Sequence, residues 1–187
     1  ECKEGNRILY ILFIDFQKAF DSVEINTLLI KLGKFGIVGK SLGLIRDLLS
    51  GRKYQVDNDV IDVKAGVPQG SLLSPILFNI YVNDLLELLE KCGKSVTSPV
   101  LAFADDICVL SSEIEEIRNM AKAISEWSEK NYFHVGIKKC GLLMINSMMA
   151  RSRAKIYLES VKVDSVLKYR YLGMNIGRNG ISSKIYK

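Results

Sequence analysis

The sequence predicts an α+β fold in which a ferredoxin-like split β-α-β antiparallel sheet carries helices on one face. Strand-like apolar runs alternate with segments of helical periodicity in the order β-α-(α-ββ-α)-ββ-α-β. An apolar content of 48% over 187 residues is enough for one packed domain. The longest apolar runs fall well short of the roughly 20 residues that cross a bilayer. A globular protein without membrane partners is therefore expected.

The first half of the chain is predicted to form a strand, two helices and a hairpin. Residues 7–16 are a β-rich apolar run of the buried-strand type, which ends on the carboxylate of Asp15. Residues 25–36 have apolar residues at the spacing of one helical face. A second helix is expected over 41–51 and a hairpin over 53–66, the latter with a turn at Asp57-Asn58-Asp59.

The second half is predicted to contain two longer helices and several strands. A Gly/Pro-rich loop leads into a helix within 66–93, and residues 101–112 form a strand, an Asp-Asp pair and a second strand. Residues 113–131 form a helix with acids in its first turn, where the helix dipole favours them. Short strands are expected around residues 141–146, 155–158, 161–163 and 169–176.

Three carboxylates form a candidate site. In an antiparallel sheet, the strand end that carries Asp15 can lie beside the hairpin tip that carries Asp105 and Asp106. Such carboxylates repel each other unless a cation neutralises them, and hard oxygen ligands suit Mg²⁺ or Mn²⁺. Two such ions can activate a hydroxyl nucleophile and stabilise a leaving phosphate. For the Asp-Asp pair alone a hydrated turn is the alternative, but the apolar flanks favour a site.

The segment GVPQGS, residues 66–71, is a second candidate site. It places flexible backbone and the amide of Gln69 just before a helix N-terminus, a setting suited to a nucleotide's sugar and phosphate. A plain loop followed by a helix start is the alternative.

Charge is distributed unevenly along the chain. Residues 138–187 hold 11 Lys or Arg against 2 Asp or Glu, whereas residues 1–137 hold 15 against 19. This predicts a basic C-terminal surface for a polyanion, with a merely solvated basic face as the alternative. The four cysteines contain no C-x-x-C pair and the chain has one histidine, which makes a zinc cluster improbable and favours reduced thiols in an intracellular protein.

Five blocks of sequence together resemble the reverse transcriptase domain of non-LTR (LINE-like) retrotransposons and, more distantly, group II intron reverse transcriptases. They occur in family order and cover nearly the whole chain: FIDFQKAFDSV (13–23), GVPQGSLLSPILFNIYVNDL (66–85), FADD (103–106), WSEKNYFHVGIKKCGLLMI (127–145) and YLGMNI (171–176). The first two blocks are long and specific, and the last two are weak alone.

The resemblance implies an RNA-directed DNA polymerase that transfers dNTPs to a primer 3′-hydroxyl on an RNA template during retrotransposition. Asp15, Asp105 and Asp106 would hold two Mg²⁺ ions, with Mn²⁺ as the alternative metal. The backbone carbonyl of Phe16 would be a further metal ligand. Lys139 would protonate the leaving pyrophosphate, although a solvated basic residue is the competing interpretation.

The resemblance also assigns residues to the nucleotide and the primer. Phe20 would exclude a ribose 2′-hydroxyl, although it could equally be a core residue, and Gln69 with Gly70 would contact the incoming nucleotide. The residues expected at the end of a DNA or RNA primer are Phe103, Tyr171, Leu172 and Gly173.

Three residues depart from the family pattern. Phe103 stands where Tyr is usual before the Asp pair, which loses a hydroxyl but keeps a ring. Gly136 stands where Asn is common, and Cys140 follows Lys139 where Thr is usual. The assignment of Lys139 therefore rests on a weaker match than that of the aspartates.

By the same resemblance, residues 1–187 would be a palm core with an inserted fingers-type segment and a C-terminal primer-grip hairpin. Residues 138–187 would be its basic C-terminal segment. The remaining fingers and the thumb are expected outside the sequence, which predicts weak or no polymerisation by this chain alone. A catalytically inactive relic, or a nucleic-acid-binding structural protein, is the alternative function. The nucleus is the expected location of the parent element.

Overall fold

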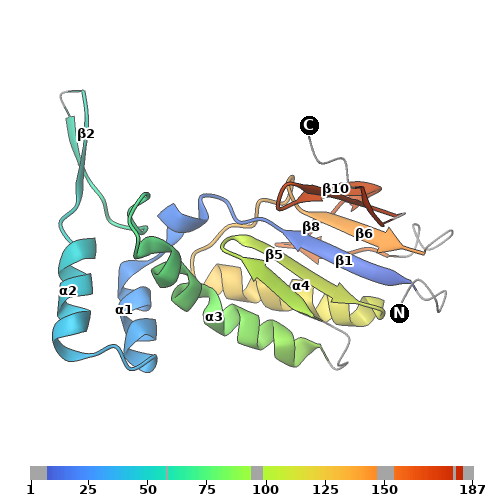
Figure 1. The fold of residues 1–187 in the computed structure, drawn as a ribbon, viewed down its shortest axis with the longest axis horizontal. Coiled ribbons are helices and arrows are strands. Elements are labelled where there is room, and N and C mark those ends of the chain that lie inside the picture. The colour runs from blue at the N-terminus through green and yellow to red at the C-terminus, as the bar shows by residue number, and fades with distance from the viewer. Residues whose placement is uncertain (1–7, 58, 94–98, 147–153, 179, 183–187) are drawn as a thin grey trace.

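The computed structural model describes residues 8–57, 59–93, 99–146, 154–178 and 180–182. Their centre is a five-stranded sheet in the order β4-β5-β1-β6-β9 (Figure 1). The strands of this sheet are β1 (Leu9–Ile14), β4 (Val100–Phe103), β5 (Asp106–Ser111), β6 (Gly141–Ile145) and β9 (Ser165–Val166).

The central sheet is mixed, which corrects the prediction of an antiparallel sheet. Its first four strands pair antiparallel, but β9 pairs parallel to β6. A strand of two residues has no alternation of apolar and polar side chains for sequence reasoning to detect, which is why β9 was not predicted.

One face of the central sheet is covered by helices. The helices α3 (Ser74–Cys92) and α4 (Ile114–Lys130) lie below it in the view of Figure 1, and α1 (Ile25–Lys34) packs on α3. Alternate residues of β1 point to this face and join the larger core cluster, namely Tyr10, Leu12 and Ile14. The predicted helix within 66–93 is confirmed as α3, and Leu77, Tyr81 and Leu85, spaced four residues apart on one face of it, are all buried.

The opposite face of the sheet is covered by a second, three-stranded sheet made of β10 (Lys168–Tyr171), β11 (Met174–Gly177) and β12 (Gly180–Ser182). Ile11 and Phe13 of β1 point to this face and belong to a separate core cluster with Tyr171. Residues 169–176 therefore form a hairpin, with Leu172 and Gly173 at positive φ in its turn. A small hairpin of β7 (Tyr157–Leu158) and β8 (Val161–Lys162) lies against α4.

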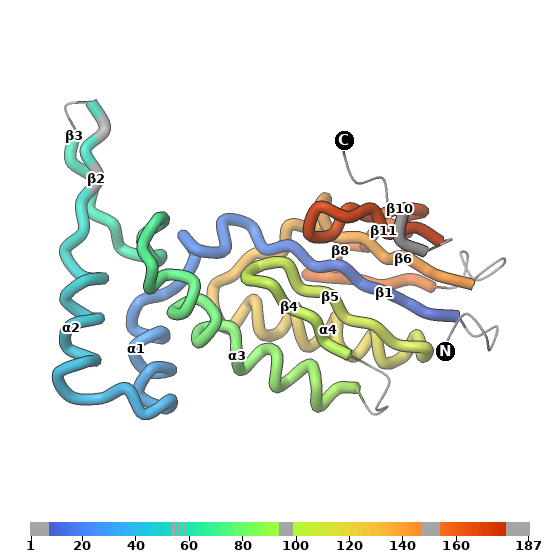
Figure 2. The backbone as a smooth tube through the Cα atoms, in the orientation of Figure 1, coloured from blue at the N-terminus to red at the C-terminus, as the bar shows by residue number. Residues whose placement is uncertain are grey.

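The remaining elements extend from one end of the molecule. After the short 3₁₀ helix η1 (Ala19–Ser22) and α1, the chain forms α2 (Gly39–Leu49) and the hairpin of β2 (Lys53–Val56) and β3 (Asp59–Asp62), which protrudes (Figures 1 and 2). Among the residues of 39–62 whose burial the structure describes, Leu49 alone is buried. The predicted hairpin is confirmed, and its turn residue Asn58 lies outside the described residues.

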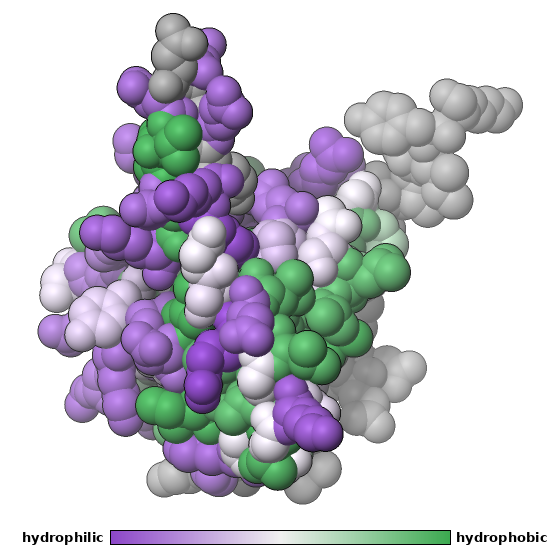
Figure 3. Space-filling model, turned by 90° about the vertical axis from the view of Figure 1, so that its left-hand side faces the viewer, coloured by the Kyte–Doolittle hydropathy of each residue, from purple (hydrophilic) through white to green (hydrophobic). Residues whose placement is uncertain are grey.

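Seen from this end, the surface is mixed: Figure 3 shows hydrophilic residues interrupted by apolar groups. The exposed apolar side chains of α1, of α2 and around the start of α3 include Ile30, Leu44, Leu48, Leu72 and Ile76. None of the helices in the described ranges is long and apolar enough to cross a membrane.

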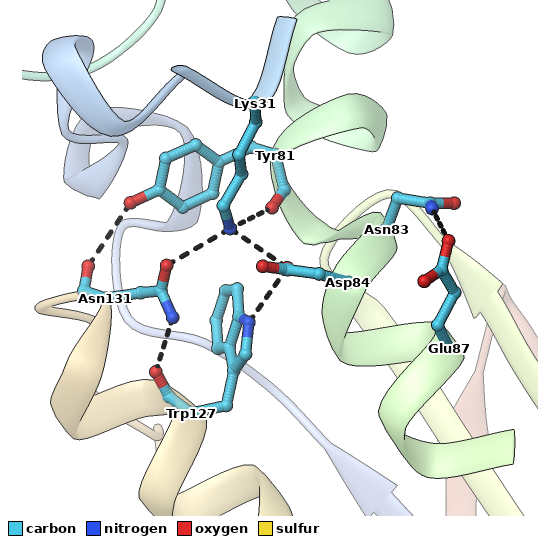
Figure 4. Close-up of polar contacts among 7 residues, drawn as sticks. All are labelled: Lys31, Tyr81, Asn83, Asp84, Glu87, Trp127 and Asn131. Atoms are coloured by element: carbon cyan, nitrogen blue, oxygen red, sulfur yellow. Dashed lines mark hydrogen bonds and ion pairs between the residues drawn. The ribbon is translucent and has the colours of Figure 1, made fainter. Parts of the chain in front are cut away.

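A buried ammonium group joins α1, α3 and the C-terminal end of α4 (Figure 4). Nζ of Lys31 donates hydrogen bonds to the backbone carbonyl of Tyr81 at 2.6 Å, to Asp84 Oδ1 at 2.9 Å and to Asn131 Oδ1 at 3.1 Å. The indole N–H of Trp127 donates to the same Asp84 oxygen at 3.0 Å. Burial lowers the pKa of Lys31, and the Asp84 carboxylate opposes that shift. The network fixes α1 against α3 and the C-terminal end of α4.

Candidate active site

The pairing of β1 with β5 brings the predicted carboxylates to one end of the central sheet. Ile14 pairs with Ile107, so Asp15 and Asp106, the next residues outward on each strand, lie at the same strand ends. Phe103 pairs with Asp106, which places Asp105 in the turn between β4 and β5. Ala104 in that turn has a φ of +53°.

Asp106 lies close enough to the other two carboxylates for their charges to raise its pKa. The pKa of Asp106 is raised by burial first and then by the negative charges of Asp105 and Asp15, while the ammonium of Lys139 lowers it. The three side chains do not form a ready metal site: the described part of the chain has no group of three or more His, Cys, Asp or Glu residues placed to hold a metal ion.

The side chain of Asp15 is recessed, with 16% of its surface exposed. Nζ of Lys139 lies 3.3 Å from its Oδ2 and 3.4 Å from its Oδ1. Oδ2 is nevertheless buried and accepts no hydrogen bond of good geometry from the residues that the structure describes. Lys139 itself is 73% exposed, so the ammonium stands at the surface above the recessed carboxylate.

The loop from 134 to 140 wraps around Asp15. The Gly136 amide donates to the Asp15 carbonyl at 2.7 Å, and the Asp15 amide donates to Sγ of Cys140 at 3.5 Å. A Cβ on Gly136 would lie 2.5 Å from Oδ2 of Asp15, so a side chain there would collide with the carboxylate. The two departures from the family pattern at Gly136 and Cys140 therefore both lie in contact with Asp15.

Burial keeps the Cys140 thiol protonated beside Asp15. Its pKa is raised to about 11 by burial, with the Asp15 charge adding to the shift. The thiol is thus a neutral neighbour of the carboxylate at neutral pH.

The GVPQGS loop lies against the turn that follows β1. The Val67 amide donates to the Phe20 carbonyl at 2.9 Å, and Nε2 of Gln69 donates to Oδ1 of Asp21 at 3.2 Å. At Gly66, a Cβ would lie 2.8 Å from Cα of Asp21, so only glycine allows this close approach. Gly70 is exposed at a φ of +84°.

The two predicted phenylalanines after Asp15 have different surroundings. Phe20 is half-buried and stacks one ring face on Phe78, with centroids 4.6 Å apart. The side chain of Phe16 is buried in the core, and its backbone forms an isolated bridge with Val135. Part of the Phe20 ring therefore remains accessible beside the loop that carries Gln69.

Arg52 supports the GVPQGS loop, and sequence reasoning missed it. Its guanidinium donates to the Gly66 and Ala65 carbonyls and to the Leu49 carbonyl. A lone Arg after a glycine has no sequence pattern that would single it out. Oγ of Ser74, the first residue of α3, donates to the carbonyl of Pro68 in the same loop.

The residues expected to meet a primer divide into outward and inward groups. Phe103 is 66% exposed, and Leu172 and Gly173 are exposed in the β10–β11 turn. Tyr171 is only 9% exposed, and its hydroxyl donates to the Asp106 carbonyl at 3.3 Å. The Tyr171 side chain thus lies within the protein, against the carboxylate hairpin, rather than on the surface beside Leu172.

Comparisons with known proteins agree with these motifs. The family model for "Reverse transcriptase (RNA-dependent DNA polymerase)" matches residues 1–176. The chain is 30% identical over 185 residues to the probable RNA-directed DNA polymerase from transposon X-element of Drosophila melanogaster, covering 92% of this chain and 20% of that protein. It is 28% identical to the RNA-directed DNA polymerase from mobile element jockey of Drosophila funebris, covering 89% of this chain and 19% of that one.

Solved structures share the fold. A telomerase from Candida tropicalis, in complex with a fragment of telomeric RNA, superposes with a TM-score of 0.75 at 15% identity, covering 97% of this chain and 31% of that one. The apo telomerase truncated from its C-terminal domain gives a TM-score of 0.71 at 16% identity, covering 97% and 37%. The chain spans about a fifth of the length of the two transposon polymerases.

Proposed function

Because the chain belongs to the reverse transcriptase (RNA-dependent DNA polymerase) family, with relatives among the polymerases of non-LTR retrotransposons, we propose that it forms the core of an RNA-directed DNA polymerase. Its reaction would be the transfer of a dNTP to a primer 3′-hydroxyl on an RNA template. The observation that carries the proposal is the meeting of Asp15 with the Asp105–Asp106 turn at one end of the central sheet.

The donor set at this end fits divalent metal ions. Oδ2 of Asp15 is buried and, among the described residues, accepts no hydrogen bond of good geometry; its cationic neighbour is the exposed ammonium of Lys139 at 3.3 Å. Burial and neighbouring negative charge raise the pKa of Asp106, so a metal cation would stabilise both carboxylates. Asp15, Asp105 and Asp106 would hold two Mg²⁺ ions, or Mn²⁺, with the Phe16 carbonyl as a further ligand. Metal ions bound there would polarise the primer hydroxyl and stabilise charge on the leaving phosphate. The hairpin tip would have to close on Asp15, since the described side chains do not yet form a cage.

Other residues of the chain would orient the substrates. Lys139 stands exposed at the mouth of the site, where its ammonium could deliver a proton to the leaving pyrophosphate once it is released from Asp15. Gln69 and Gly70 would contact the incoming nucleotide. The exposed part of the Phe20 ring, fixed by its stack on Phe78, would exclude a ribose 2′-hydroxyl.

The parts of a polymerase can be assigned to the fold. Strands β4-β5-β1-β6 with α3 and α4 would be the palm, and the protruding α2 and β2–β3 would be a fingers-type insertion. The β10–β11 hairpin would grip the primer end through Leu172 and Gly173, with Phe103 nearby on the surface. Residues 138–187 would supply a basic face for the RNA template and for a DNA or RNA primer.

The test is primer extension by a polypeptide that carries this chain together with its flanking sequence in the parent reading frame. We expect oligo-dT to be extended on poly-rA with Mg²⁺ or Mn²⁺. Asp105→Asn should abolish extension, because a neutral amide is a poor substitute for a metal-binding carboxylate. Glu126→Gln, on the exposed side of α4, is the control and should leave the rate unchanged.

Two outcomes would count against this function. Extension by Asp105→Asn at a near-wild-type rate would remove that residue from the site. A wild-type protein that binds the primer–template but extends nothing would favour the inactive, nucleic-acid-binding alternative. The isolated 187-residue chain is expected to extend primers weakly or not at all.

A further inference from the structure

Two tyrosines of β10 contact the main chain of both segments that carry the candidate catalytic residues. The hydroxyl of Tyr169 donates to the Lys139 carbonyl at 2.7 Å, and that of Tyr171 donates to the Asp106 carbonyl at 3.3 Å. The two residues are two apart on one strand, so their side chains point to the same face of it, toward the central sheet. Neither contact follows from the family motifs, which place Tyr171 at the primer and leave Tyr169 without a role.

The position of Tyr169 is tightly defined. Its ring stacks on Phe13 of β1 with centroids 4.0 Å apart and an angle of 3° between the planes. Below the ring lies Gly141, the first residue of β6, where a Cβ would come within 3.0 Å of the ring. A side chain at residue 141 would therefore crowd the ring, whose stack on Phe13 directs the hydroxyl to the Lys139 carbonyl.

Tyr171 reaches the other segment from the same strand. Its ring lies 5.5 Å from that of Phe13, tilted by 45°, and its side chain is buried in the smaller core cluster with Cys108 of β5. Its hydroxyl donates a hydrogen bond to the backbone carbonyl of Asp106, the first residue of β5. Burial raises the pKa of both tyrosines to about 12, so both hydroxyls are protonated donors at neutral pH.

We propose that Tyr169 and Tyr171 are positioning residues that couple the β10–β11 hairpin to the acidic end of the central sheet. Phe13 supports both rings, and each hydroxyl holds one segment by its main chain: Lys139 on one side of Asp15 and Asp106 on the other. A displacement of the hairpin, whose turn exposes Leu172 next to Tyr171, is thereby transmitted to the carboxylates. The role in catalysis rests on the proposed polymerase function, whereas the coupling itself does not.

The coupling is tested by removing each hydroxyl and keeping each ring. Tyr169→Phe and Tyr171→Phe are compared with Tyr81→Phe, whose hydroxyl donates to the Asn131 carbonyl at 3.4 Å among the helices, away from the carboxylates. Amide hydrogen exchange of the 187-residue chain is measured without metal or nucleic acid. Tyr169→Phe should speed exchange about 5-fold at residues 137–141, and Tyr171→Phe at residues 104–107, as expected for the removal of one hydrogen bond. Tyr81→Phe should change neither region.

The second readout is Mn²⁺ affinity, followed by the electron paramagnetic resonance signal of free Mn²⁺. Both β10 variants should bind Mn²⁺ more weakly than wild type by a few-fold, and Tyr81→Phe should bind it equally well. In the polymerase assay, kcat should fall while KM for dNTP stays unchanged. A purely structural role would lower Tm in all three variants and leave Mn²⁺ affinity, kcat and KM as they are in wild type.

The outcomes separate the two proposals. If exchange in both regions matches that of Tyr81→Phe, the coupling is wrong whatever the protein's activity. If wild type binds no Mn²⁺ and extends no primer, the polymerase function fails, and with it the catalytic role of the tyrosines, while the exchange data still decide the coupling. Local faster exchange with unchanged Mn²⁺ affinity and unchanged kcat would also overturn the positioning role.

Discussion

Gly136 sets how close the loop from 134 to 140 can come to Asp15. Gly136→Ala would put a Cβ 2.5 Å from Oδ2 of Asp15, so either the carboxylate or the loop must move. Overpacking of this kind costs roughly 1–3 kcal/mol, and we expect that loss in urea unfolding together with weaker Mn²⁺ binding.

A matched glycine shows whether the effect is local. Gly43 lies within α2, and a Cβ at this position would meet no atom within 4 Å, so Gly43→Ala should stabilise the chain by about 0.5–1 kcal/mol. If Gly136→Ala were as stable as wild type and bound Mn²⁺ equally well, the close approach to Asp15 would have no consequence.

Asp106 is expected to oppose folding at neutral pH. Its pKa is raised from the ordinary value of 3.8, so the folded chain binds this proton more tightly than the unfolded chain does. Stability linked to this group is therefore fully present below 3.8 and is lost as the pH rises through the raised value. Asp106→Asn should be more stable than wild type at about pH 7 in EDTA, and the difference should shrink toward zero by about pH 3.

Thermal unfolding across this pH range measures the difference. Added Mn²⁺ should stabilise wild type more than Asp106→Asn, because only the carboxylate gains a partner. A variant less stable than wild type at neutral pH would contradict the raised pKa.

For single residues, sequence reasoning identified the carboxylates but missed the side chains that hold the neighbouring main chain in place. The meeting of Asp15 with Asp105 and Asp106 was predicted from carboxylates that interrupt apolar strands, and the strand pairing confirms it, whereas their role in metal binding stays a prediction. Arg52, Tyr169 and Tyr171 donate to backbone carbonyls of residues that are distant in the sequence or carry no motif of their own. Every residue has a backbone carbonyl, so the residue types in the sequence do not indicate which carbonyl will accept such a hydrogen bond.

Among the elements, α1, α3 and α4 depend on one buried cation. Lys31→Met would keep the apolar stem but leave the Tyr81 carbonyl, Asp84 and Asn131 without their shared donor. We expect a loss of about 2 kcal/mol in urea unfolding, less than for a fully buried ion pair, because the Asp84 side chain is 51% exposed. Trp127, the one tryptophan of the chain, reports the change by fluorescence, since Lys31 Nζ lies 5.1 Å from its ring.

The control is an exposed lysine on α4. Lys122 pairs with Glu126 at 3.6 Å with both side chains mostly exposed, so Lys122→Met should change stability by less than about 0.5 kcal/mol. Equal effects of the two substitutions would show that the buried network adds nothing beyond a surface pair.

The long elements were predictable and the short strands were not. The helices lie within or close to their predicted ranges, because the spacing of apolar residues indicates a helix and a glycine often follows its last residue. Gly93, for example, is the C-cap of α3. The C-terminal hairpin that the family resemblance implied around Tyr171 and Gly173 is present as β10 and β11, whereas β9 and β12 were missed. Such short strands are specified by the partner strand's free backbone groups, which local sequence does not contain.

For the whole molecule, the uneven charge along the chain predicts a basic C-terminal surface. Residues 155–178 lie at the end of the molecule opposite α2 (Figure 2), and several exposed basic side chains belong to them, namely Lys155, Lys162, Lys168 and Arg170. If this face contacts phosphates, affinity for an RNA–DNA duplex should fall linearly with the logarithm of salt concentration.

Replacing Lys168 and Arg170 by Gln should make that salt dependence less steep, by about one unit of slope for each phosphate that is no longer neutralised. Fluorescence anisotropy of a labelled duplex at several salt concentrations measures it. Lys122→Gln on α4 is the control and should leave the slope unchanged. An unaltered slope in the double variant would mean that this face is only solvated.

The segment from α2 through β3 buries one described side chain, Leu49, and the β2–β3 hairpin protrudes from the rest of the protein. The contacts of the segment with the rest include the half-buried Leu42 and Ile45, which pack against the core, and Arg52, which donates hydrogen bonds to the GVPQGS loop and the residue before it. Most side chains of this segment contact few other residues, so most substitutions there should disturb little packing. Selection for folding should therefore constrain the sequence of this segment only weakly. Among descendants of a common ancestor, residues 39–62 should accumulate changes and length differences fastest, unless a ligand or partner imposes its own demands. Slow sequence divergence in residues 39–62 would therefore indicate that a ligand or partner binds this segment.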